Sequence, residues 1–79
     1  MNKNVFYRKI PKVDILLEEE RIRQMICRYS KETVMESIRK ETDRLRAFIG
    51  KCEDEKEIEA AIGGLTDAIG QTVEEMHTP

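Results

Sequence analysis

The sequence is poor in the residues that form metal sites, covalent cross-links and catalytic centres. Its 79 residues include one histidine, two cysteines and no tryptophan. His77 has no cysteine or carboxylate near it at a metal-ligand spacing, so we expect no metal site there. Cys27 and Cys52 form neither a CxxC motif nor a framework of paired cysteines, and neither has an evident histidine base. We therefore expect two reduced thiols in a cytoplasmic protein without a nucleophilic centre.

Long apolar runs and phosphate loops are also missing. No run approaches the roughly 18 residues of a membrane span, and no apolar stretch follows a basic start as in a signal peptide. Gly63, Gly64 and Gly70 lie within a helical pattern with no preceding strand, which excludes a glycine-rich phosphate loop. A pocket for both a cofactor and a substrate would take up most of so small a core. These absences argue against a membrane protein and against a self-contained enzyme.

A helical repeat of apolar residues is present, in a composition that is 39% hydrophobic and 38% charged. Residues 1–9 show no clear period, whereas Pro11 fits the first turn of a short helix over about 11–18. The acidic run 18–20 interrupts the repeat, which resumes over 22–29 as a continuation of the same helix or as a second one. Ser30 suits the N-cap of the longest helix, and Gly50 suits a left-handed residue at its end.

A final helix is predicted after Asp54, which with Glu57 resembles a capping box. Gly63 and Gly64 fall in its middle, where each costs about 1 kcal/mol relative to alanine, and they mark a close helix contact or a break. No strand pattern is present. The prediction is an all-α fold, one domain over residues 1–79, built as an antiparallel bundle of three or four helices. Its predicted apolar stripes in the two longest helices are Val34, Ile38, Leu45, Phe48 and Ile49, and Ile58, Ile62, Leu65, Ile69, Val73 and Met76.

The net charge of −2 conceals an asymmetry between the two parts of the chain. Residues 1–51 hold thirteen Lys or Arg against eight Asp or Glu, a net charge of +5. Residues 52–79 hold one lysine against eight acids, a net charge of −7. Such a distribution indicates an anionic partner for the basic part, or an attraction between the two parts on folding.

The basic residues form three groups along the sequence. Guanidinium groups bind phosphate oxygens in a bidentate way, and a spread of them suits contact with a nucleic-acid backbone. Aromatic residues are sparse among them, which favours recognition of a folded duplex shape over splayed single strands. The groups are Arg8, Lys9 and Lys12 near the first helix start, Arg21, Arg28 and Lys31 near one helix face, and Arg39, Lys40, Arg44 and Arg46 on the polar side of the long helix.

Two segments carry a more specific resemblance. Residues 5–17, VFYRKIPKVDILL, combine an aromatic lead, a basic pair, an Ile-Pro step and an apolar helix. Residues 33–41, TVMESIRKE, followed by Leu45, Arg46 and Ile49, lie at a compatible distance. In register, the two segments resemble the N-terminal domain of bacterial selenocysteine synthase, L-seryl-tRNA(Sec) selenium transferase, over about residues 5–50. The acidic last helix matches only in general character.

The resemblance implies a small helical domain that binds tRNA(Sec) and is joined by a linker, starting at about residues 74–79, to a pyridoxal-phosphate domain outside this chain. The parent enzyme is a homo-oligomer that converts L-seryl-tRNA(Sec) to L-selenocysteinyl-tRNA(Sec) with selenophosphate. No cofactor, catalytic residue or membrane contact is expected in the present chain, which we expect to be monomeric. The tRNA-contact role transfers by resemblance to Arg8, Lys9 and Lys12, which lie in the matched motif. By charge alone we extend it to Arg28, Lys31, Arg39 and Lys40.

Two other classes of function stay open. A helix-turn-helix DNA-binding domain would use residues 30–46 as its recognition helix, although Glu32, Glu36, Glu41 and Asp43 would then face phosphates. A protein-docking module would use the apolar stripe from Ile58 to Met76 as its partner surface.

Overall fold

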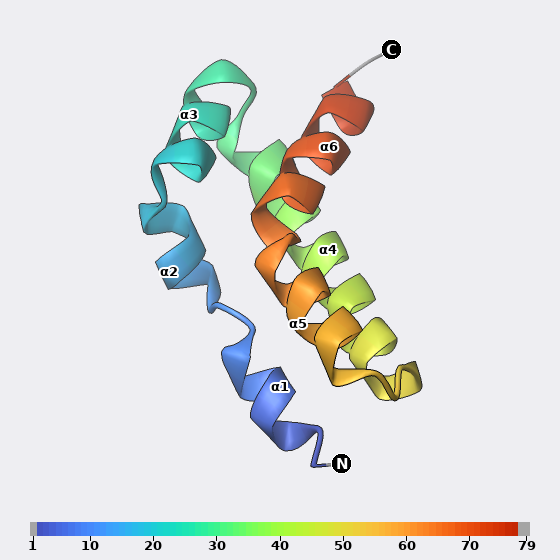
Figure 1. Ribbon diagram of the computed structural model, residues 1–79. Helices are drawn as coiled ribbons and strands as arrows, with labels where there is room; N and C mark the ends of the chain where they lie inside the picture. The colour runs from blue at the N-terminus through green and yellow to red at the C-terminus, as the bar shows by residue number, and fades with distance from the viewer. Residues whose placement is uncertain (1, 78–79) are drawn as a thin grey trace.

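The computed structural model describes residues 2–77, which form six helices and no strand. They are α1 (Asn4–Lys9), α2 (Val13–Glu18), α3 (Glu20–Arg28), α4 (Lys31–Lys51), α5 (Glu55–Gly63) and α6 (Leu65–His77). Figure 1 shows three antiparallel passes, in which α1, α2 and α3 run in one direction, α4 returns, and α5 with α6 runs back beside it. The predicted all-α antiparallel fold is confirmed. The predicted number of helices is wrong, because the first and last passes are both broken.

The first break follows from Pro11. The ring of a proline disfavours helical backbone at the preceding residue, and Ile10 is extended, with ψ of 121°. Pro11 therefore lies outside the helix rather than in its first turn, and α2 begins at Val13 with Lys12 as its N-cap. Residues 1–9, which showed no period, contain the helix α1. Its buried residue Phe6 and the following Ile10 are too few to form a recognisable repeat.

The second break, at Glu19, rotates the chain between α2 and α3. Glu19 is extended, with ψ of 137°. Leu16 and Ile22 are both completely buried. Six residues in one continuous helix span about 600°, which would place these two side chains on different faces. The break at Glu19 therefore lets both side chains reach the core, which one continuous helix would not allow.

The long helix has the predicted start but not the predicted end. The Oγ of Ser30 accepts a hydrogen bond from the backbone N–H of Thr33 at 3.1 Å, which confirms the N-cap. Gly50, however, is helical, and no residue from 2 to 77 has a positive φ. The helix ends at Lys51. The carbonyl oxygen of Gly50, in its last turn, accepts a hydrogen bond from Nζ of Lys3 at 2.8 Å.

The third pass is capped as predicted and broken at the glycine pair. Oδ1 of Asp54 accepts from the N–H groups of Lys56 and Glu57 at 2.9 and 3.3 Å. No return bond from the Glu57 side chain to the Asp54 N–H is formed; that N–H donates to Sγ of Cys52 at 3.4 Å. Gly64 separates α5 from α6, with φ and ψ of −93° and 6°. The prediction that allowed a break is thus the correct one.

The core lies where the three passes meet, and the most extensive contact joins α4 to α6. Of the predicted stripes, Phe48 and Met76 are exceptions, because they are 40% and 39% exposed. Ile62 is partly buried and packs against the core. Both cysteines are free thiols. None of the helices formed by residues 2–77 is long and apolar enough to cross a membrane. The buried core residues are Phe6, Ile10, Leu16, Ile22, Val34, Ile38, Leu45, Ile49, Ile58, Leu65, Ile69 and Val73.

Candidate nucleic-acid interface

The seven basic residues predicted to bind nucleic acid are all exposed, but they do not form one patch. The structure measures 40 × 26 × 16 Å along its principal axes. In Figure 1, α1 lies at one end of this long shape, and the turn from α3 to α4 lies at the other. The seven residues are distributed over both ends and the middle of α4: Arg8, Lys9, Lys12, Arg28, Lys31, Arg39 and Lys40.

The first group surrounds the Ile-Pro step. Arg8 and Lys9 form the last turn of α1, and Lys12 is the N-cap of α2. Because Pro11 breaks the helix between them, the three side chains stay close along the chain without sharing one helix face. Nζ of Lys9 lies 3.0 Å from Oε1 of Glu59. One member of the group is therefore already paired with a carboxylate.

The second group lies at the turn between α3 and α4. Arg28 is the last residue of α3, and Lys31 is the first residue of α4. The guanidinium carbon of Arg28 lies 5.7 Å from the centre of the Tyr29 ring. The prediction that Arg21, Arg28 and Lys31 share one helix face is wrong for Lys31, because the chain reverses at Tyr29 and Ser30.

The third group lies on the exposed side of α4. Arg39 and Lys40 are exposed halfway along the helix, and the acidic residues Glu36 and Asp43 are exposed on the same side. Glu41, by contrast, is buried. The long helix therefore presents a surface of mixed charge, which would place carboxylates against phosphates if it entered a DNA groove.

Attraction between the basic and acidic parts is realised in three ion pairs of residues 2–77. They join Lys3 to Glu53, Lys9 to Glu59 and Arg21 to Asp67. Two of these lysines and arginines belong to α1 and α3, and all the acids belong to the third pass or the loop before it. Surface ion pairs of this kind contribute about 0–1 kcal/mol each. The charge asymmetry therefore serves partly to hold the first pass against the third.

The apolar stripe of the third pass is not available to a protein partner. Ile58, Leu65, Ile69 and Val73 are 3% exposed or less and form the core with α4. A docking module that used this stripe would have to unfold first.

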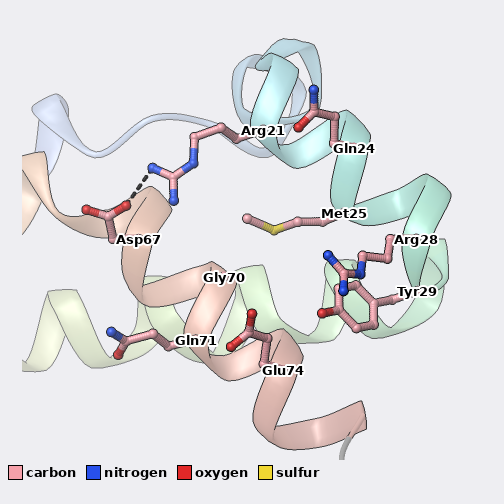
Figure 2. A pocket seen from close by; sticks show the side chains of 9 residues that line it. All are labelled: Arg21, Gln24, Met25, Arg28, Tyr29, Asp67, Gly70, Gln71 and Glu74. Carbon is pink, nitrogen blue, oxygen red and sulfur yellow. Dashed lines mark hydrogen bonds and ion pairs between the residues drawn. The ribbon is translucent and has the colours of Figure 1, made fainter.

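A pocket of about 410 Å³ opens between α3 and α6. Figure 2 shows the ion pair of Arg21 and Asp67 at one end, the Met25 side chain in the middle, and Arg28 beside the Tyr29 ring at the other end. A Cβ atom on Gly70 would lie 3.0 Å from Cε of Met25. The end of the Met25 side chain therefore packs directly against α6 at this glycine. The lining residues are Arg21, Gln24, Met25, Arg28, Tyr29, Asp67, Gly70, Gln71 and Glu74.

Sequence reasoning singled out Arg21 and Arg28 for their charge but did not detect the pocket. The α3 and α6 residues that form it are 39 to 53 positions apart, and the apolar repeat over residues 22–29 gave no sign that Met25 and Tyr29 line a pocket. Among residues 2–77 there is also no group of three His, Cys, Asp or Glu side chains placed to hold a metal ion. The pocket offers two guanidinium groups, two carboxylates, two amides, a thioether and one aromatic ring.

Comparison with known protein families identifies a family that this chain matches. The profile of the family described as "Selenocysteine synthase N terminal" matches residues 7–46. This range contains the Ile-Pro step, α2, α3 and the first three quarters of α4. Searches of curated proteins and of solved structures found no significant match. With half of its residues matched by that profile, in agreement with the two segments that resemble selenocysteine synthase, the chain belongs to the selenocysteine synthase N-terminal family.

Proposed function

We propose that this domain binds tRNA(Sec) and holds it for a parent selenocysteine synthase, which converts L-seryl-tRNA(Sec) to L-selenocysteinyl-tRNA(Sec) with selenophosphate. The observation that carries the proposal is the family match over residues 7–46, which includes all seven exposed basic residues predicted to bind nucleic acid. The mechanism is recognition of shape. A rigid domain 40 Å long, with cations at both ends and in the middle, contacts phosphates and 2′-hydroxyls at separated points of a folded RNA.

The shape of the RNA is the property that such spacing measures. The tRNA that inserts selenocysteine has unusual arm lengths. Contacts to 2′-hydroxyls and phosphates read this shape and carry little information about base sequence. Cations at fixed separation match one arrangement of phosphates and mismatch others. In the parent enzyme, tRNA binding by this domain places the seryl end of the tRNA near the reaction centre. Several such domains on one homo-oligomer add avidity.

Pyridoxal phosphate, the cofactor of the parent enzyme, does not fit the residues of this chain. Its Schiff base requires a lysine in a desolvated pocket. Lys3 is the one lysine among residues 2–77 that is not exposed, and its Nζ is engaged by the carbonyl of Gly50 and the carboxylate of Glu53. We therefore assign the cofactor and the chemical step to other parts of the parent enzyme, and tRNA binding to this domain.

The test is a titration of labelled tRNA(Sec) and tRNA(Ser) with the 79-residue chain at two salt concentrations. We expect tighter binding to tRNA(Sec), and weakening with salt because counterions are released from phosphates. Replacing Arg8, Lys9 and Lys12 by alanine should lower the salt dependence by about one unit per lost phosphate contact.

The matched control replaces Arg23, Lys51 and Lys56, three exposed basic residues outside the predicted set, by alanine. The control changes the net charge by the same amount as the first triple variant. It should weaken binding less, because its three residues are not predicted to contact the RNA. Equal affinity for both tRNAs, or equal losses in the two triple variants, would leave only a general basic surface. Absence of binding at low salt would overturn the proposal.

A further inference from the structure

We infer that the pocket between α3 and α6 accepts a single unpaired nucleobase of the bound RNA. The identity of the ligand rests on the proposed tRNA binding, whereas the chemistry of the pocket rests on its own lining. Its volume of about 410 Å³ lies within the range of about 300–1,000 Å³ typical of small-ligand pockets. A base presents two flat apolar faces and an edge of donors and acceptors, and the pocket provides a counterpart for each.

The floor of the pocket is apolar. Met25 extends from α3 between the two helices (Figure 2), and its thioether is a polarisable surface on which an aromatic ring can rest. Gly70 lies beneath it on α6, where an added Cβ would come within 3.0 Å of Cε of Met25. The missing side chain at position 70 lets Met25 lie deep between the helices, and this depth leaves room for a ring above it.

One wall of the pocket is aromatic and held in place. The Tyr29 ring contacts the His77 ring edge-on, with centroids 4.8 Å apart and planes at 73°. The guanidinium carbon of Arg28 lies over the ring, 5.7 Å from its centre. Tyrosine rings and guanidinium planes are the surfaces on which proteins stack unpaired bases. Because the guanidinium lies over the ring, an unpaired base would stack on the guanidinium plane or take its place on the ring.

The polar groups favour a base over a phosphate inside the pocket. Gln71 lines the pocket at an exposed position, and its amide can offer a base edge both a donor and an acceptor. Arg21 is paired with Asp67, and the carboxylate of Glu74 also lines the pocket. The two carboxylates balance the two guanidinium groups of the lining, so the interior has no net positive charge to hold a phosphate. The attached phosphate is therefore expected at the rim, near Arg28 and Lys31.

The test follows the backbone amide signals of the 79-residue chain by NMR while the 5′-monophosphates of adenosine, guanosine, cytidine and uridine are added separately. Ribose 5-phosphate and inorganic phosphate serve as probes that lack the base. The inference requires saturable shifts at Met25, Gly70 and Gln71 with at least one nucleotide and none with ribose 5-phosphate. Equal shifts with ribose 5-phosphate, or no saturable shift with any nucleotide, would overturn it.

A pair of glycine variants locates the effect. Gly70→Ala forces the end of the Met25 side chain to move, and it should weaken nucleotide binding by about tenfold, at the low end of a lost stacking contact. Gly63→Ala adds the same methyl group where no atom lies within 4 Å, and it should leave binding unchanged. Gln71→Ala should also weaken nucleotide binding. It should not disturb packing, because position 71 is exposed and lies in a helix that tolerates alanine. Unaltered binding in both Gly70→Ala and Gln71→Ala would contradict the assignment.

The two proposals can fail separately. Nucleotide binding in the pocket without tRNA binding would overturn the proposed function and leave the pocket assignment standing. Binding of tRNA(Sec) without any nucleotide-induced shift would support the proposed function and overturn the pocket assignment.

Discussion

The hydroxyl of Thr72 donates a hydrogen bond to Oε2 of Glu41 at 2.6 Å and joins α6 to α4 across 31 residues of sequence. The same carboxylate oxygen accepts from Nη1 of Arg44 at 3.0 Å. Glu41 is 7% exposed and Thr72 is 4% exposed. A buried carboxylate costs free energy unless hydrogen bonds replace its water, so this network specifies how the two helices align.

Replacing Thr72 by valine should lower the free energy of unfolding by about 1.5–3 kcal/mol. The substitution keeps the shape of the side chain but removes a hydrogen bond to a charged and buried group. Chemical denaturation measures the change. Thr42→Val is the matched control, because the Thr42 hydroxyl donates to carbonyls of its own helix and leaves no buried charge behind. Equal losses in the two variants would show that the Glu41 contact has no special weight.

Replacing Ser30 by alanine should destabilise the protein by about 1 kcal/mol, because the first turn of α4 loses the acceptor for the Thr33 N–H. Ser30→Asn, which retains an acceptor at the N-cap, should restore most of the loss. The two variants are compared by urea denaturation. An unchanged midpoint for Ser30→Ala would mean that water satisfies this N–H equally well.

Replacing Gly63 by alanine should stabilise the protein by about 0.5–1 kcal/mol. The residue is the last of α5, has no positive φ, and has open space where a Cβ would lie. Alanine therefore reduces the freedom of the unfolded chain without a steric cost. Gly64→Ala should stabilise less, since its Cβ would meet the carbonyl oxygen of Ala60 at 3.4 Å. A lower thermal midpoint for Gly63→Ala would contradict the argument.

Replacing Glu59 by glutamine should strengthen tRNA binding, because it releases Lys9 from an ion pair of 3.0 Å and makes the ammonium available to a phosphate. The salt dependence of binding should rise by about one unit. Glu55→Gln is the control, since it changes the net charge equally at an exposed position of the same helix that forms none of the ion pairs found among residues 2–77. If the two variants gain equally, the effect is one of net charge, and Lys9 has no specific contact.

The candidate interface was partly visible in the sequence. Arg8, Lys9 and Lys12 were predicted to bind tRNA because they lie beside the Ile-Pro step, a contiguous motif, and all three are exposed. The pairing of Lys9 with Glu59 was not predictable, because it joins residues fifty positions apart. The same reason explains why Arg28 was recognised as a cation but not as part of a pocket with Gly70.

The sequence by itself determined the helical class, the caps at Ser30 and Asp54 and most of the buried stripes, since each depends on spacing within a few residues. Only the tertiary structure decided that α2 and α3 are separate helices, because the break at Glu19 is favoured by burying Leu16 and Ile22 against the same core. It also decided that Phe48 is exposed and Glu41 buried, although the helical repeat alone assigns the phenylalanine to the core. Local preference specifies the capped helix starts, whereas the contacts between passes determine the break at Glu19 and which faces are covered.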